Sequence, residues 1–161
     1  MLAELENSQF SVLVRGELWG WPLILTLHAL GTAVVIGFIF IINLRLLGLF
    51  ETIPYASLKR LFPLVWAAIV LQFLTGFALW TAKPTRYVAD VAFLLKFSCV
   101  IIGIVLTSYL YGIIKREAAS WDTAGSVSSP GIKFVAPSLL VWCVVVMAGR
   151  LTAYLGAVYL G

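Results

Sequence analysis

The chain alternates between long apolar blocks and short polar segments. Four apolar blocks can be drawn, at residues 22–44, 61–80, 88–114 and 137–160. A helix needs about twenty apolar residues to cross the ~30 Å hydrocarbon core of a bilayer. The two-residue alternation typical of a membrane barrel strand is weak throughout. The pattern therefore predicts an all-α fold, an integral membrane four-helix bundle that forms a single transmembrane domain.

The composition supports a membrane protein. The chain has 161 residues, of which 62% are hydrophobic and 11% charged, whereas charged residues make up about a quarter of an ordinary soluble domain. The formal net charge of +4 is explained by membrane topology rather than by a nucleic-acid partner. We expect membrane lipid around the helices, together with other membrane subunits or further copies of the chain.

The basic residues between the blocks predict the orientation. Six flank one side of the predicted membrane and three flank the other. The six are Arg45, Lys59, Arg60, Lys115, Arg116 and Lys133, and the three are Arg15, Lys83 and Arg86. Because cytoplasmic loops carry the excess of Lys and Arg, we expect the first group in the cytoplasm. Both termini then lie on the outer, periplasmic side of a bacterial inner membrane.

Two segments outside the blocks have patterns of their own. Residues 8–21 mix apolar and charged positions, which favours a short interfacial helix. The connection 115–136 contains "AGSVSSPG", and its Gly, Ser and Pro content predicts a flexible cytoplasmic loop.

Strongly polar residues inside the blocks are few and one-sided. They are His28, Gln72, Lys96 and Arg150, all in the predicted outer half or near the midplane. The predicted cytoplasmic halves are nearly free of such groups, apart from Asn43 at the boundary of the first block. Ionisable residues inside a bilayer are costly and mark candidate functional sites. This distribution is the most informative feature of the chain.

Arg150 is the sharpest case. It lies ten residues before Leu160, about 15 Å along a helix, which predicts a position near the bilayer centre. Two interpretations stay open: an anion-binding role, or an arginine paired with carbonyls or Gln72 inside the bundle. Cys143, Met147 and Tyr154 fall on the same helical stripe, about 60° wide.

His28 is the single histidine, and Gly31 beside it leaves room for a flat ligand. One hypothesis is haem b, with His28 as the metal ligand and Arg150 or Lys96 paired with propionates. The candidate cofactor-binding residues are His28, Arg150, Lys96, Met147 and Gln72, with Met147 as the internal methionine available for a second axial bond. The alternatives are a neutral histidine hydrogen-bonded across helices and a lysine that extends to the interface.

Three stretches carry a resemblance: "LHALGTAVVIGFIFIINLRLLG", "FLLKFSCV" and "MAGRLTAYLG". The chain resembles an uncharacterised bacterial family of small four-helix membrane proteins, whose first helix has a His and an "LRLLG" ending and whose last has a "GR" pair. A more distant likeness is to membrane proteins of the copper-resistance D type. The resemblance implies the four-helix fold and draws attention to His28, Lys96 and Arg150 without assigning them a role.

Three functions from different classes stay open. The absence of hydrolase, zinc and phosphate-loop motifs favours a chain that is not an enzyme by itself. The first function is a redox-associated subunit that holds haem b or contacts quinone in the outer leaflet. The second is a non-catalytic accessory subunit that packs against a larger membrane complex. The third is a Cu(I) or small-solute transporter component with His28, Cys99, Cys143 and Met147 as soft ligands.

Overall fold

The computed structural model describes residues 2–16 and 18–158, and every regular element in them is an α-helix. The helices are α1 (Leu2–Glu6), α2 (Gln9–Gly16), α3 (Gly20–Leu46), α4 (Tyr55–Leu58), α5 (Phe62–Ala82), α6 (Pro84–Ala89), α7 (Val91–Ala124), α8 (Ser129–Lys133) and α9 (Val135–Val158). Within the described residues, four stretches built around α3, α5, α7 and α9 are long and apolar enough to cross a membrane. The predicted all-helical class with four candidate spans is confirmed. Residues 17, 159 and 160 of the expected segments lie outside the described residues.

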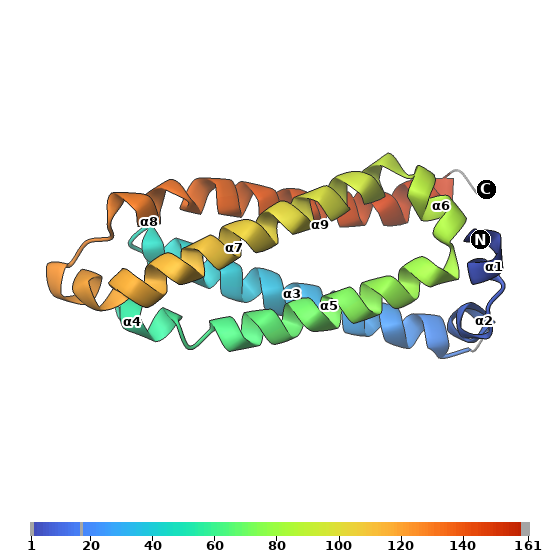
Figure 1. Cartoon of the computed structure of the whole chain (residues 1–161), viewed down its shortest axis with the longest axis horizontal. Helices are drawn as coiled ribbons and strands as arrows, with labels where there is room; N and C mark the ends of the chain where they lie inside the picture. The colour runs from blue at the N-terminus through green and yellow to red at the C-terminus, as the bar shows by residue number, and fades with distance from the viewer. Residues whose placement is uncertain (1, 17, 159–161) are drawn as a thin grey trace.

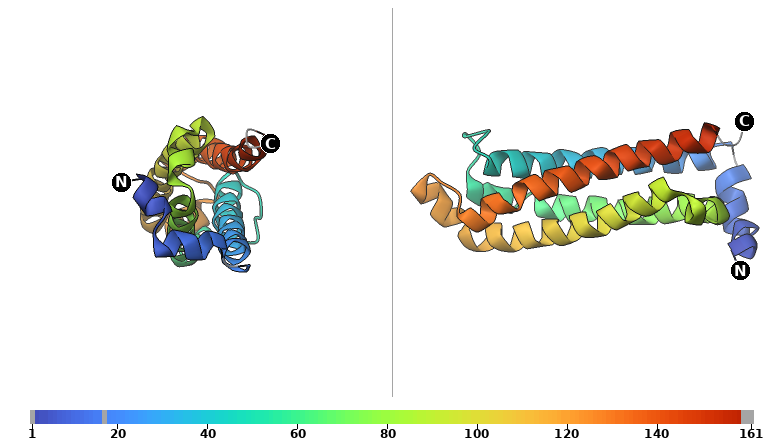
Figure 2. Two further views of the ribbon diagram at one scale, coloured as in Figure 1. Left: turned by 90° about the vertical axis from the view of Figure 1, so that its right-hand side faces the viewer. Right: turned by 90° about the horizontal axis from the view of Figure 1, so that it is seen from above.

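The four long helices form an elongated bundle of two antiparallel pairs (Figures 1 and 2). Helix α3 packs along α5, and α7 packs along α9. The short helices α4 and α8 lie at one end of the bundle, called here the α4 end. Helices α1, α2 and α6 lie at the opposite end, called here the α6 end (Figure 1).

The large buried side chains gather in the half of the bundle nearest the α4 end. They are Ile39, Leu46, Leu58, Phe62, Val65, Ile113, Ile114 and Val135, each under 2% exposed. Toward the α6 end the inward positions are small, with Gly31 and Ala148 buried and Gly76 and Gly149 half-buried. Large apolar side chains also cover the outside, where Phe73 is 67% exposed. An apolar exterior of this extent suits contact with lipid rather than water.

Helix α7 is longer than the expected span. It continues to Ala124, so that ten residues of the expected flexible loop 115–136 are helical, and α8 occupies part of the remainder. The extension is held by contacts with α4: the Asp122 carboxylate accepts hydrogen bonds from the backbone N–H of Tyr55 at 2.7 Å and of Ala56 at 2.9 Å. The Trp121 ring packs edge-on against Tyr55. These long-range contacts outweigh the local loop signal.

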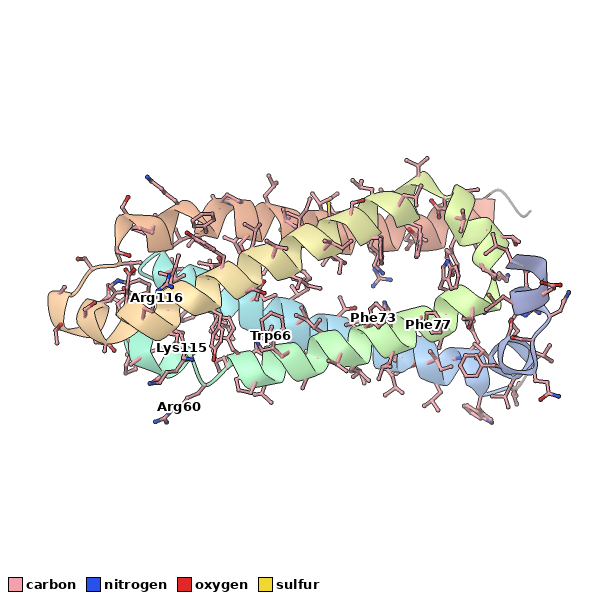
Figure 3. The ribbon with its side chains drawn as sticks, viewed as in Figure 1. Arg60, Trp66, Phe73, Phe77, Lys115 and Arg116 are labelled. Atoms are coloured by element: carbon pink, nitrogen blue, oxygen red, sulfur yellow. The ribbon has the colours of Figure 1, made fainter. Side chains whose placement is uncertain are left out.

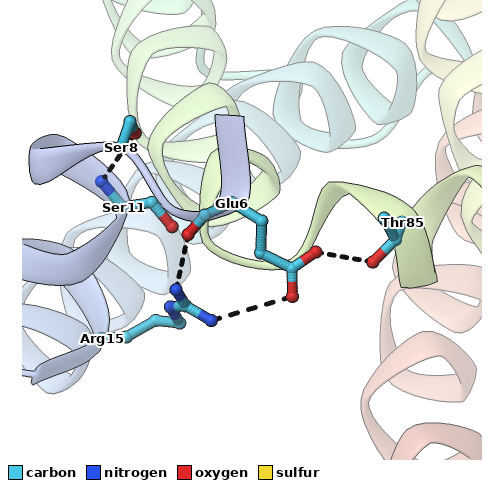
Figure 4. A network of polar contacts seen from close by, with 5 residues as sticks. All are labelled: Glu6, Ser8, Ser11, Arg15 and Thr85. Atoms are coloured by element: carbon cyan, nitrogen blue, oxygen red, sulfur yellow. Dashed lines mark hydrogen bonds and ion pairs between the residues drawn. The ribbon is translucent and has the colours of Figure 1, made fainter. Parts of the chain in front are cut away.

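The N-terminal segment lies across the α6 end, close to the position expected for an interfacial helix. Helix α2 buries Ser11 and Val14, while Arg15 forms an ion pair with Glu6 at 3.7 Å. Glu6 also accepts a hydrogen bond of 2.6 Å from the Thr85 hydroxyl at the start of α6 (Figure 4). These contacts fasten α1 and α2 to the connection between α5 and α6.

Two glycines of α7 provide a matched test of helix packing. A Cβ on Gly103 would lie 2.9 Å from Trp142 of α9, whereas one on Gly112 would meet nothing within 4 Å. We expect Gly103→Ala to displace Trp142 and to lower stability by about 1–3 kcal/mol, the usual cost of overpacking. Gly112→Ala is expected to be neutral or to stabilise by up to about 1 kcal/mol. Thermal unfolding in mild detergent measures both, and equal effects of the two variants would contradict this packing.

Candidate functional site

His28 lies on the face of α3 that packs against α5. Its Nδ1 is 2.9 Å from the hydroxyl oxygen of Thr75, and its ring lies so close to Gly76 that a Cβ there would be 3.2 Å from Cε1. Sequence reasoning missed Thr75 and Gly76. The available signal is their spacing, since they follow Gln72 by three and four residues and so share its helix face.

The hydrogen bonds of Thr75 determine which nitrogen of His28 carries the proton. The Thr75 hydroxyl donates its single proton to the Leu71 carbonyl at 2.7 Å. With the proton placed there, the hydroxyl accepts from His28 and Nδ1 carries the ring proton; we assign this tautomer from the hydrogen-bond pattern. The lone pair of Nε2 is then free, and no hydrogen bond joins Nε2 to a described residue. A histidine in this state can bind a metal ion or accept a hydrogen bond.

Gln72 completes the contact between α3 and α5. Its amide nitrogen donates to the His28 carbonyl at 2.7 Å and to the Thr32 hydroxyl. The Thr32 hydroxyl itself donates to the His28 carbonyl at 2.8 Å. The Gln72 Oε1 is buried and accepts no hydrogen bond from a described residue. These four residues, His28, Thr32, Gln72 and Thr75, are called here the His28 network, and they leave one free acceptor on Gln72 and one on His28.

Lys96 approaches the same level from the other helix pair. It is half-buried on α7, and its Nζ would be 3.5 Å from a Cβ on Gly149 of α9. The ammonium is close enough to the His28 ring to interact with it electrostatically. No hydrogen bond or ion pair joins Lys96 to another described residue. The structure therefore joins His28 to Gln72 by a hydrogen bond between α3 and α5, and places the Lys96 charge within electrostatic range of the His28 ring without an ion-pair partner.

Arg150 and Met147 lie elsewhere. The Arg150 side chain is exposed, Met147 is 66% exposed and Tyr154 is 67% exposed, so the predicted stripe on α9 faces away from the bundle. Arg150 makes no hydrogen bond or ion pair with a described residue. The physical reason is helix rotation: α9 turns Gly149 and Thr152 inward, and each successive residue is displaced by about 100°. The expected pocket shared by His28 and Arg150 is not present in this arrangement, and Met147 does not face His28.

Arg150 also lies closer to the α6 end than its distance from the end of the helix implies. The Arg86 guanidinium of α6 donates to the Thr152 carbonyl at 3.2 Å, which places Thr152 beside this connection. Arg150 is two residues further into the bundle, a rise of about 3 Å. Helix α9 continues for six residues beyond Thr152, to Val158, so its end is a poor marker of depth.

The neighbouring α6 segment carries Tyr87, which is half-buried. Burial raises the pKa of the Tyr87 phenol above its ordinary value, and the nearby Arg86 charge opposes that shift. The phenol is therefore neutral at physiological pH, as suits an aromatic side chain at a membrane boundary.

The four candidate copper ligands lie on three helices, with His28 on α3, Cys99 on α7, and Cys143 and Met147 on α9. Among the described residues there is no group of three or more His, Cys, Asp and Glu that could hold a metal ion. Cys99 is half-buried on α7, while Cys143 is exposed on α9 together with Met147. His28 lies between α3 and α5, so these four candidate copper ligands are spread over different faces.

No protein-family model, curated protein or solved structure matches the chain. The resemblance to a family of small four-helix membrane proteins stays a prediction. The interpretation of the site therefore rests on its geometry.

His28 is the single histidine, so nitrogen NMR of ¹⁵N-histidine-labelled protein gives the signal of one ring. At neutral pH we expect a protonated Nδ1 and an unprotonated Nε2. Thr75→Val removes the acceptor while preserving the side-chain shape, and is expected to shift the ring toward the Nε2–H form and to cost about 0.6 kcal/mol, the average for such bonds in membranes.

The matched control is Thr26→Val, because Thr26 donates only to the Pro22 carbonyl on the exposed side of α3. Its histidine spectrum should equal that of the unaltered protein. A wild-type ring protonated at Nε2 would contradict the assignment.

Proposed function

We propose that the chain is a small multi-pass membrane subunit that binds a membrane-soluble ligand through His28, Gln72 and Lys96. The observation that carries this proposal is the half-buried ammonium of Lys96, which has no ion-pair partner and lies within electrostatic range of His28. A lysine in such a place is costly in lipid. An unpaired cation of this kind is better explained by a ligand than by packing.

In this proposal the α4 end faces the cytoplasm of a bacterial cell and the α6 end faces the periplasm. Support comes from the basic side chains at the α4 end, where Arg60, Lys115 and Arg116 project outward (Figure 3). Exposed Lys and Arg concentrate on the cytoplasmic side of membrane proteins. The ligand site then lies in the outer leaflet, and both ends of the chain lie outside.

The free groups define the chemistry of the ligand. Nε2 of His28 and Oε1 of Gln72 accept hydrogen bonds, and Nζ of Lys96 donates them. A flat, lipid-soluble quinol satisfies all three, since its hydroxyls donate to His28 and Gln72 and its oxygens also accept from Lys96. The oxidised quinone makes only the bond from Lys96, because its oxygens accept and do not donate. Haem b is the alternative ligand. Nε2 of His28 would bind its iron, and Lys96 would pair with one of its propionates. Because Met147 faces outward, it would not provide the sixth ligand of such a haem.

A second candidate is the non-catalytic accessory subunit. The exposed face of α9 favours it, because Arg150 there makes no hydrogen bond or ion pair with a described residue. A membrane subunit with an acidic residue at this depth would complement the charge. Loss of a copurifying subunit in Arg150→Gln would support this candidate, whereas loss of bound anionic lipid alone would assign Arg150 to the headgroups.

Lys96→Met tests the proposed ligand site. The substitution keeps most of the length of the unbranched side chain and removes its charge. We expect the Kd for a short-chain benzoquinone, followed by tryptophan fluorescence, to rise at least tenfold, which corresponds to about 1.4 kcal/mol. The same variant should unfold at a higher temperature, because a lysine at the centre of a membrane helix costs about 2.5–3.5 kcal/mol. A gain of stability together with a loss of binding indicates a residue retained for function.

Lys115→Met is the matched control, since Lys115 is exposed at the α4 end, and it should leave the Kd unchanged. Two further measurements distinguish the ligand classes. A Soret band in the visible spectrum that His28→Ala abolishes indicates bound haem, whereas a quinone or quinol recovered by organic extraction of the purified protein indicates a quinone-type ligand. The ligand site would be refuted if Lys96→Met and the unaltered protein bound the quinone with the same Kd and the purified protein showed no Soret band.

A further inference from the structure

A second polar group lies in the core, in the half nearest the α4 end. Asn43 of α3 is 1% exposed, Thr107 of α7 is 3% exposed and Ser138 of α9 is 0% exposed. They are surrounded by apolar side chains such as Ile39 and Phe62. Polar atoms in this setting cost free energy unless each finds a hydrogen-bond partner.

The hydrogen bonds leave one strong acceptor unused. The Asn43 amide nitrogen donates to the Ile39 carbonyl at 2.7 Å and to the Ser138 hydroxyl at 3.2 Å. The Asn43 Oδ1 is buried and accepts nothing from a described residue. Exchanging the amide oxygen and nitrogen would place two acceptors 2.7 Å apart at Ile39, so the orientation of the amide is fixed.

Two hydroxyl protons beside Asn43 are also unassigned. The Thr107 hydroxyl accepts from Nε1 of Trp142 at 3.3 Å, and the Ser138 hydroxyl accepts from Asn43. Neither hydroxyl donates to another described residue. The group therefore offers one free acceptor and two free donors.

These three side chains line a cavity of about 10 Å³. Residues of α3, α5, α7 and α9 all contribute to its wall, so it lies where the two helix pairs meet. A cavity of about 10–15 Å³ holds one water molecule, which needs two to four polar partners. The volume of the cavity and the number of free polar groups around it therefore both match one water molecule.

We propose that this cavity is a binding site for a single water molecule that joins α3 to α7 and α9. The water donates one hydrogen bond to Oδ1 of Asn43 and accepts hydrogen bonds from the hydroxyls of Thr107 and Ser138. A sodium ion is a less favourable occupant than water, because none of the residues that line the cavity has a carboxylate to balance its charge. The proposal is independent of the ligand site at the α6 end, with which it shares no residue.

The chain has two asparagines, Asn7 and Asn43, so ¹⁵N-asparagine labelling in lipid nanodiscs isolates the side chain at issue. We expect a long-lived cross-peak between water and the Asn43 side-chain amide, absent at the exposed Asn7. Asn43→Leu removes the amide and fills the cavity, so the loss of the cross-peak in this variant assigns the signal to Asn43. Ser138→Ala removes one donor, keeps Asn43 in place and should weaken the cross-peak.

Thermal unfolding in equal concentrations of sodium chloride and choline chloride distinguishes water from a cation. We expect the same midpoint in both salts. A higher midpoint in sodium, lost in Ser138→Ala, would overturn the proposal in favour of a cation site. Absence of the water cross-peak in the folded, unaltered protein would overturn it in favour of a dry cavity.

Discussion

The structure depends on one constraint, which is that a polar group within the apolar bundle must find its partner inside the protein. The chain meets it with bonds between helices and to nearby backbone carbonyls. His28 binds Thr75 across α3 and α5, Trp142 binds Thr107 across α9 and α7, and Arg45 donates to the Ile53 carbonyl at 2.6 Å. Each bond fixes the rotation of a helix that apolar packing alone leaves loosely determined. The exceptions, at Lys96, Gln72 and Asn43, are therefore the informative positions.

The distribution of side-chain size explains why the proposed ligand site lies toward the α6 end. Large side chains such as Phe62 and Ile113 fill the space between the helix pairs near the α4 end. Toward the α6 end, Gly31, Gly76 and Gly149 bring polar side chains close to the opposing backbone. Small residues permit such approaches in membrane helices. The α4 half is thus built for packing, and the α6 half presents polar groups on both helix pairs.

The sequence predicts the helical class and the polar residues of the candidate site. The length and hydropathy of each apolar block, and the few polar residues inside it, are local properties that can be read directly. Helix rotation is not local. Arg150 and Lys96 are comparable cations in sequence, yet one is exposed and the other turns inward, since the small residues Gly149 and Thr152 decide which side of α9 packs. The extension of α7 likewise depends on Asp122 meeting α4, a pairing across 67 residues that no local pattern contains. Asn43 lies at the predicted boundary of a span, and no local pattern in the sequence indicates that its side chain is buried.

The two polar sites have different physical consequences because of where they lie. The residues of the proposed ligand site come from separate helix pairs, with His28 and Gln72 on α3 and α5 and Lys96 on α7. Their spacing therefore depends on how the pairs are set relative to each other. That setting is determined at the α4 end, where all four long helices meet around Asn43. A change in packing there acts over the length of the helices, so a small rotation at the crossing becomes a larger displacement at Lys96. The relative positions of His28, Gln72 and Lys96 are thus tied to the packing of the distant core, although the two groups share no residue.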